Sequence, residues 1–143
     1  MVNARPRLVP LLAGVLFLVL SIAPASAGEA RAEARAVIQR QLDAFARDDA
    51  GSAYALAAPG IKTIFTDSAT FMAMVRRQYA PVYRHREAEF GTFSSEGDAA
   101  SQMLTIVDAD GQVWTALYQL ARQPDGSWLI AGCLLIRAAA KDA

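Results

Sequence analysis

The sequence predicts an α+β domain in which N-terminal helices pack on a curved antiparallel sheet of about four strands. Helical patterns occupy the first half of the chain, and runs rich in β-branched and aromatic residues occupy the second half. Two Asp-Gly pairs, ending at Gly111 and Gly126, separate three of these runs as hairpin loops do. Helices and strands that are segregated along a chain are typical of α+β folds.

The first 27 residues have the pattern of an export signal rather than of a folded element. Arg5 and Arg7 precede an apolar run over residues 11–22, and a small-x-small pattern ends at Ala27. The run is shorter than the roughly 20 residues that a membrane-spanning helix needs. We therefore expect cleavage near Ala27, a periplasmic or secreted protein, and no stable membrane anchor after cleavage.

Removing 27 of the 143 residues leaves 116, enough for one domain over residues 28–137 with a flexible tail over residues 138–143. Without Arg5 and Arg7, 12 basic residues face 14 acidic ones, which argues against nucleic acid as a partner. Cys133 is the only cysteine, and its apolar neighbours indicate a packed strand residue. No motif requires a cofactor or a metal.

An amphipathic helix is predicted over residues 30–47, because its apolar side chains recur at helical spacing. These are Ala34, Val37, Ile38, Leu42 and Phe45. Asp48 and Asp49 end it and cap a second, short helix over residues 52–57, which Pro59 and Gly60 stop. With Asp43 they form an acidic group whose spacing favours capping over a metal site.

Residues 61–65 fit either a short strand or an irregular connector. A third helix follows, capped by Asp67 or Ser68 and ending near Ala80, because Pro81 restricts the residue before it. Its apolar side chains are Phe71, Met74, Val75 and Tyr79. The first strand then covers residues 87–93, and the segment 94–98 is a turn.

The last three strands form a meander whose register follows from its turns. If residues 124–126 form a type I turn with a bulge, the pairs are Leu120–Ile130, Tyr118–Gly132 and Trp114–Ile136, and the other turn gives Leu104–Ala116 and Ile106–Trp114. One face is then the core: Leu104, Ile106, Trp114, Ala116, Tyr118, Leu120, Trp128, Ile130, Leu134 and Ile136. A one-residue slip would invert this assignment.

The opposite face is also too apolar for a sheet surface left in water. It carries Val107, Val113, Thr115, Leu117, Gln119, Leu129, Ala131, Cys133 and Leu135. In a domain of this length the helices cover only one face. We therefore expect part of the second face to meet another subunit or a ligand.

His85 is the only histidine, and with Asp43 it is the obvious acid/base pair to test. The competing interpretation is an exposed histidine at the start of a strand, since Arg84 and Arg86 flank it and favour solvent. The sequence favours this second interpretation. Catalysis is therefore not expected, although a pocket dyad stays open as an alternative.

Basic and aromatic residues are concentrated between positions 76 and 86, and they are the best binding candidates in the chain. The set is Arg76, Arg77, Tyr79, Tyr83, Arg84 and Arg86. Guanidinium groups hold carboxylates or phosphates bidentately, which predicts an anionic ligand. The competing interpretation, which the sequence favours, is a solvated helix end whose arginines favour the negative end of the helix dipole.

Four further aromatic side chains, Tyr54, Trp114, Tyr118 and Trp128, are candidates for the wall of a pocket between helices and sheet. Such a pocket would suit a small hydrophobic or amphipathic molecule. The same rings are equally suited to fill a core.

Several segments carry a family resemblance: VIQRQLDAF at 37–45, DD at 48–49, YALAAPGI at 54–61, FMAMVRRQYAPVY at 71–83, WTALY at 114–118, PDGSW at 124–128 and AGC at 131–133. Together they look like the DUF4864 family of exported bacterial proteins of unknown function. The resemblance implies an NTF2-like, cystatin-like cone, in which helices and a bent sheet enclose a pocket. In such cones the outer sheet face often makes a dimer.

These observations favour an exported domain that binds a small ligand or a partner without catalysis and forms a homodimer. Two alternatives remain open. One is a pocket enzyme of the dehydratase or isomerase kind that uses His85 and Asp43, and the other is an accessory protein of envelope assembly.

Overall fold

The structure is a computed structural model that describes residues 26–139. Five helices come first: α1 (Ala27–Ala46), α2 (Ala50–Ala55), α3 (Pro59–Ile64), α4 (Ser68–Gln78) and α5 (Ala80–Tyr83). Four strands follow as an antiparallel sheet in sequence order: β1 (Glu87–Glu96), β2 (Ala99–Val107), β3 (Val113–Arg122) and β4 (Trp128–Arg137). The predicted α+β class is confirmed.

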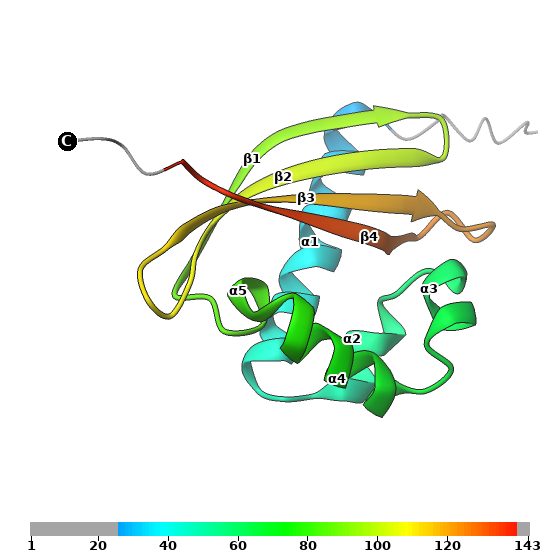
Figure 1. Cartoon of the computed structure of the whole chain (residues 1–143). Coiled ribbons are helices and arrows are strands. Elements are labelled where there is room, and N and C mark those ends of the chain that lie inside the picture. The colour runs from blue at the N-terminus through cyan, green and yellow to red at the C-terminus, as the bar shows by residue number, and fades with distance from the viewer. Residues whose placement is uncertain (1–25, 140–143) are drawn as a thin grey trace, which may run out of the picture.

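Helix α1 crosses one face of the sheet, and the shorter helices lie near the β4 edge of the sheet (Figure 1). The predicted apolar stripe explains this placement, because Ala34, Val37, Ile38, Leu42 and Phe45 are all buried. The segment after α2 lies along the start of β4, where the Ala58 amide donates to the Ile130 carbonyl at 2.7 Å. The helices therefore meet the sheet at α1 and at the free edge of β4.

The helix boundaries confirm two of the predicted caps. The Asp49 carboxylate accepts from the Ser52 amide at 3.0 Å and starts α2, and Asp67 accepts from the Thr70 amide at 2.7 Å and starts α4. Asp48, with a φ of 58°, ends α1 in the left-handed region that Asp and Asn tolerate better than most residues.

The sequence does not predict the short helices α3 and α5, because Pro59 and Pro81 indicate helix ends rather than helix starts. Residues 61–65, expected as a strand or connector, belong largely to α3, which Pro59 opens. Pro81 likewise lies in the first turn of α5. At the first turn of a helix proline loses no hydrogen bond, and its fixed φ favours the helix, so each proline begins an element here.

The predicted register is confirmed up to the middle of β4 and is wrong beyond it. The pairs Leu104–Ala116, Ile106–Trp114 and Leu120–Ile130 are present. A bulge then inserts Ala131, so that Tyr118 lies opposite Cys133 rather than Gly132, and Trp114 opposite Arg137 rather than Ile136.

The bulge exchanges the two faces of the end of β4. Cys133 and Leu135 pack against the core, whereas Leu134 and Ile136, expected inside, are 56% and 53% exposed. The rest of the predicted inner face is correct: Leu104, Ile106, Ala116, Tyr118, Leu120, Trp128 and Ile130 are buried and Trp114 is half-buried.

No helix within residues 26–139 is long and apolar enough to cross a bilayer. The apolar run over residues 11–22, the predicted cleavage motif up to Ala25 and the chain end from residue 140 lie outside the described residues.

Candidate functional site

A cavity of about 240 Å³ lies between the helices and the β4 side of the sheet. Residues from the helices and from the sheet line it. The helices give Gln41 and Phe45 from α1, Ile61 and Phe65 from α3 and its end, and Phe71, Met74, Val75, Gln78, Tyr79 and Val82 from α4 to α5. The sheet gives Tyr118 and the segment from Ile130 to Cys133, which contains the bulge.

Local structure explains why these side chains converge. Gln41 lies on the buried stripe of α1, three residues after Ile38 and four before Phe45, so its side chain faces inward with theirs. The bulge at Ala131 turns Cys133 inward, directly across from Tyr118. The shape of the cavity therefore depends on the buried stripe of α1 and on the bulge in β4.

Two ionisable groups deep in the cavity, Tyr118 and Cys133, remain uncharged. Tyr118 is 1% exposed, and burial raises the pKa of its hydroxyl well above the usual value near 10.0. Burial likewise raises the pKa of the Cys133 thiol to about 12. Both therefore carry their protons at neutral pH, and the thiol is not a nucleophile there.

Most polar groups of the wall already have partners. The Tyr79 hydroxyl donates to the Cys133 carbonyl at 3.0 Å, and the Gln41 side-chain amide donates to the Ala53 carbonyl at 3.3 Å. Gln78 lies at the exposed rim. The Tyr118 hydroxyl differs, because its side-chain hydrogen bond is with the Cys133 thiol, a weak hydrogen-bonding group.

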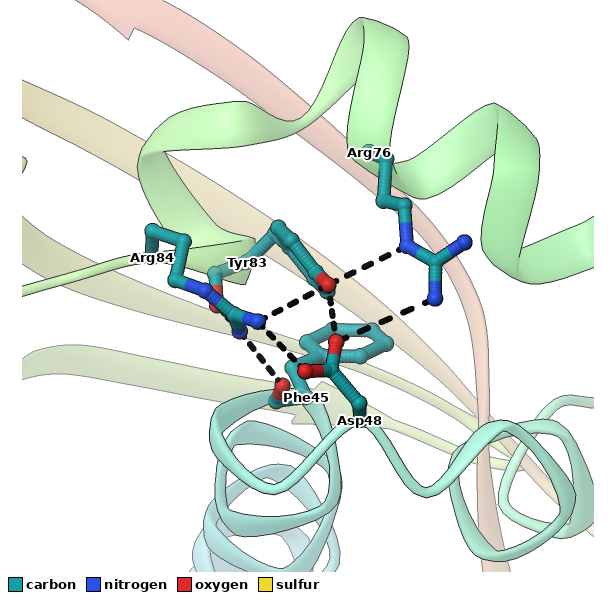
Figure 2. A network of polar contacts seen from close by, with 5 residues as sticks. All are labelled: Phe45, Asp48, Arg76, Tyr83 and Arg84. Atoms are coloured by element: carbon teal, nitrogen blue, oxygen red, sulfur yellow. Dashed lines mark hydrogen bonds and ion pairs between the residues drawn. The ribbon is translucent and has the colours of Figure 1, made fainter.

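A second cluster of polar groups lies where the end of α1 meets α4 and α5 (Figure 2). At its centre, the Asp48 carboxylate pairs with the Arg84 guanidinium at 2.7 Å and with that of Arg76 at 3.8 Å. The Tyr83 hydroxyl donates to Asp48 and accepts from Arg76 Nε at 3.1 Å. Arg84 also donates to the Phe45 carbonyl at 2.8 Å, which ties α5 to α1. We call these four residues, Asp48, Arg76, Tyr83 and Arg84, the Asp48 network.

The Asp48 network places a carboxylate where an anionic ligand was predicted. The hydrogen bond from Tyr83 and then the two arginines lower the pKa of Asp48, so the carboxylate stays ionised. Arg76 and Arg84 are thus paired within the chain. Arg86 does not join them, because it lies at the start of β1, where its amide donates to the Val107 carbonyl at 2.8 Å.

His85 and Asp43 are not brought together. The His85 Nδ1 atom lies 2.9 Å from the Val82 carbonyl, whereas Asp43 is exposed on α1 and accepts from Gln39 Nε2 at 2.9 Å. Neither residue lines the cavity. The predicted pocket dyad therefore has no geometric support. Within residues 26–139 no group of three or more His, Cys, Asp or Glu side chains is placed to hold a metal ion.

Of the predicted binding residues, Tyr79 and Tyr118 reach the cavity. Tyr54 packs behind its wall, with its ring centroid 5.6 Å from that of Phe71 and its hydroxyl donating to the Phe65 carbonyl at 2.6 Å. Trp114 lies towards the β2–β3 turn, where its indole donates to Asp108 at 2.9 Å. Sequence reasoning missed Gln41, although its place on an apolar stripe was a readable signal.

A bent antiparallel sheet with helices on one face and a cavity between them defines an α+β domain of the NTF2-like class. An NTF2-like protein of unknown function from Shewanella baltica OS155 has a TM-score of 0.55 at 12% identity, covering 82% of this chain and 100% of its own. One from Silicibacter pomeroyi DSS-3 has a TM-score of 0.56 at 17% identity, covering 80% of this chain and 100% of its own. At such identities the likeness shows the fold alone.

The family is established by sequence. Residues 27–143 match DUF4864, described as a domain of unknown function, and the chain belongs to this family. The resemblance inferred from the sequence is confirmed. No curated protein matches the chain.

Proposed function

We propose that this protein is an exported binding domain that holds a small, mainly apolar molecule in the cavity between α4 and β4, without catalysis. The observation that carries the proposal is the cavity itself, about 240 Å³ with walls that are mostly apolar and aromatic. Mostly apolar walls are usual for a small-molecule site, because burying apolar surface contributes about 25 cal/mol of favourable free energy per Å². The volume is below the usual range of about 300–1,000 Å³, which restricts the site to a small ligand. The predicted leader and cleavage near Ala27 are the grounds for export.

Native mass spectrometry tests this proposal. The protein is expressed with its own leader and recovered from the periplasm, and we expect a chain that begins at Gly28 and carries a reproducible non-covalent extra mass. Met74→Trp, on the cavity wall, should remove that mass by filling the space. Met103→Trp makes the same change at a residue that is 40% exposed on the outer face of the sheet, and it should retain the extra mass. A bare wild-type protein would argue against ligand binding and in favour of a partner protein.

We further propose that the outer face of β2 to β4 pairs with a second copy of the chain. Its exposed apolar residues are Met103, Val113, Leu134 and Ile136. The intervening outward residues, such as Thr105, Thr115 and Leu117, carry no charge. Two such faces therefore meet without like-charge repulsion, whereas the neighbouring strand β1 presents Glu87 and Glu89.

Sedimentation velocity at micromolar concentration tests the dimer. We expect a dimer for the wild type and a monomer for Leu134→Lys, which places a charge in the proposed interface. Ile64→Lys is the matched control, because Ile64 is 73% exposed on α3 rather than on the sheet. A monomeric wild type would refute this part of the proposal and leave the cavity unaffected.

A further inference from the structure

The wall of the cavity is uncharged. Among its fifteen lining residues there is no Asp, Glu, Lys, Arg or His. Its ionisable groups, Tyr79, Tyr118 and Cys133, keep their protons, because burial raises the pKa of each. Nothing in the wall therefore offers a full charge to a ligand.

The arginines close in sequence to the wall do not supply the missing charge: Arg40 and Arg77, next to Gln41 and Gln78, are exposed and do not line the cavity. Arg76 lies one residue after Val75 and Arg84 two residues after Val82, but both guanidinium groups are directed to Asp48 (Figure 2). A carboxylate or ammonium group brought into the cavity would lose its hydration without gaining a counter-charge. Such a transfer is strongly unfavourable.

Among the three hydroxyl and amide side chains that line the inner part of the cavity, Tyr118 has the weakest hydrogen-bond partner. The Tyr79 hydroxyl proton is used on the Cys133 carbonyl, and Gln41 donates to the Ala53 carbonyl. The Tyr118 hydroxyl has its side-chain hydrogen bond with the Cys133 thiol, which is a weak partner. A buried phenol normally finds a stronger partner than a thiol, so this hydroxyl is the donor that a ligand would use.

We infer that the cavity selects an uncharged molecule that is largely apolar and bears one hydrogen-bond acceptor, such as a carbonyl oxygen, which accepts from the Tyr118 hydroxyl. This inference rests on the proposed small-ligand function. It adds the chemical class of the ligand and the residue that recognises it.

Four single-ring probes test the inference by NMR titration of the folded protein: toluene, acetophenone, benzamide and benzoate. We expect saturable shifts at the cavity residues with the three uncharged probes and none with benzoate, although benzamide and benzoate have nearly the same shape. Benzoate binding as tightly as benzamide would overturn the claim that the site excludes charge. If no probe shifts the resonances of the cavity residues, the proposed small-ligand function itself is refuted.

The role of Tyr118 is tested by Tyr118→Phe, which removes only the hydroxyl. The affinity for acetophenone should fall about three- to tenfold, the range expected for one hydrogen bond, while that for toluene stays the same. Tyr79→Phe is the matched control, because it removes a hydroxyl that is already engaged, and it should leave the ratio of the two affinities unchanged. If Tyr118→Phe lowered the affinities for acetophenone and toluene equally, the cavity would still be a binding site, but recognition of the ligand by the Tyr118 hydroxyl would be refuted.

Discussion

The Asp48 network and the cavity both centre on a tyrosine hydroxyl, but only one of the two hydroxyls is fully used. Tyr83 is half-buried near solvent, and its hydroxyl contacts Asp48, Arg76 and Arg84. Tyr118 is buried, and its hydroxyl has a thiol as its neighbour. Arg76, Tyr83 and Arg84 of the Asp48 network stand close together in the sequence, whereas the residues that line the cavity are spread along the chain. The comparison teaches that a dense group of arginines and tyrosines can be satisfied by the chain itself, whereas the open site consists of scattered apolar residues.

The first prediction concerns the thiol in the cavity, where the largest effect is expected. With a pKa of about 12, Cys133 has on the order of a thousandfold less thiolate at pH 8 than an ordinary cysteine. Labelling by a disulfide reagent should therefore be slower by about that factor in the native protein than in urea. Similar rates in both states would mean that the cavity is open to solvent, and the contrast with the Asp48 network would disappear.

The second prediction compares the two tyrosines directly. Tyr118→Ala should lower the free energy of unfolding by about 3–5 kcal/mol, because it leaves a large void in the core. Tyr83→Ala should lower it by only about 1 kcal/mol, since its ring is half-buried and its polar partners can turn to water. Urea denaturation measures both. Equal losses would show that the Asp48 network supports the fold as strongly as the core does.

The third and smallest effect is a pH dependence of the Asp48 network. Because the folded-state pKa of Asp48 is lowered, its contribution is complete above the unfolded pKa of about 3.9 and is lost as the pH falls through the folded pKa. Asp48→Asn keeps a residue that tolerates the left-handed backbone. The difference in urea midpoint between wild type and this variant should be present at pH 7 and shrink by pH 3.

Asp43→Asn provides the control for this measurement. It removes a carboxylate from α1 whose partner is the uncharged Gln39 side chain. The midpoint should therefore change little at either pH. A pH dependence equal to that of Asp48→Asn would assign the effect to the overall charge of the chain rather than to the network.

Much of the fold could be predicted because it depends on short-range patterns. The stripe of α1 and the Asp-Gly turns are local, and Gly111 and Gly126 indeed have φ values of 80° and 86°. Proline misled the prediction of α3 and α5, since the same residue either ends a helix or begins one. The bulge in β4 left no signal, because the residues on both of its faces are apolar.

The candidate site was harder to predict, because its geometry comes from contacts between distant segments. Asp48 meets Tyr83 and Arg84 across 35 and 36 positions, so nothing local showed that the arginines were already paired. Tyr118, a pocket candidate from the sequence, lines the cavity, but the sequence predicts its partner Cys133 on the opposite face, because the bulge leaves no signal. Gln41 could have been found, since a polar residue on an otherwise apolar stripe is an anomaly.

The extra residue in β4 also bears on how the sheet forms. Without it, the β3–β4 hairpin would bury Leu134 and Ile136 in place of Cys133 and Leu135, with a similar hydrophobic gain. What distinguishes the native pairing is contact with the helices, such as the hydrogen bond from Tyr79 to the Cys133 carbonyl. We therefore expect a slipped hairpin to compete during refolding until α4 docks and selects the correct alignment.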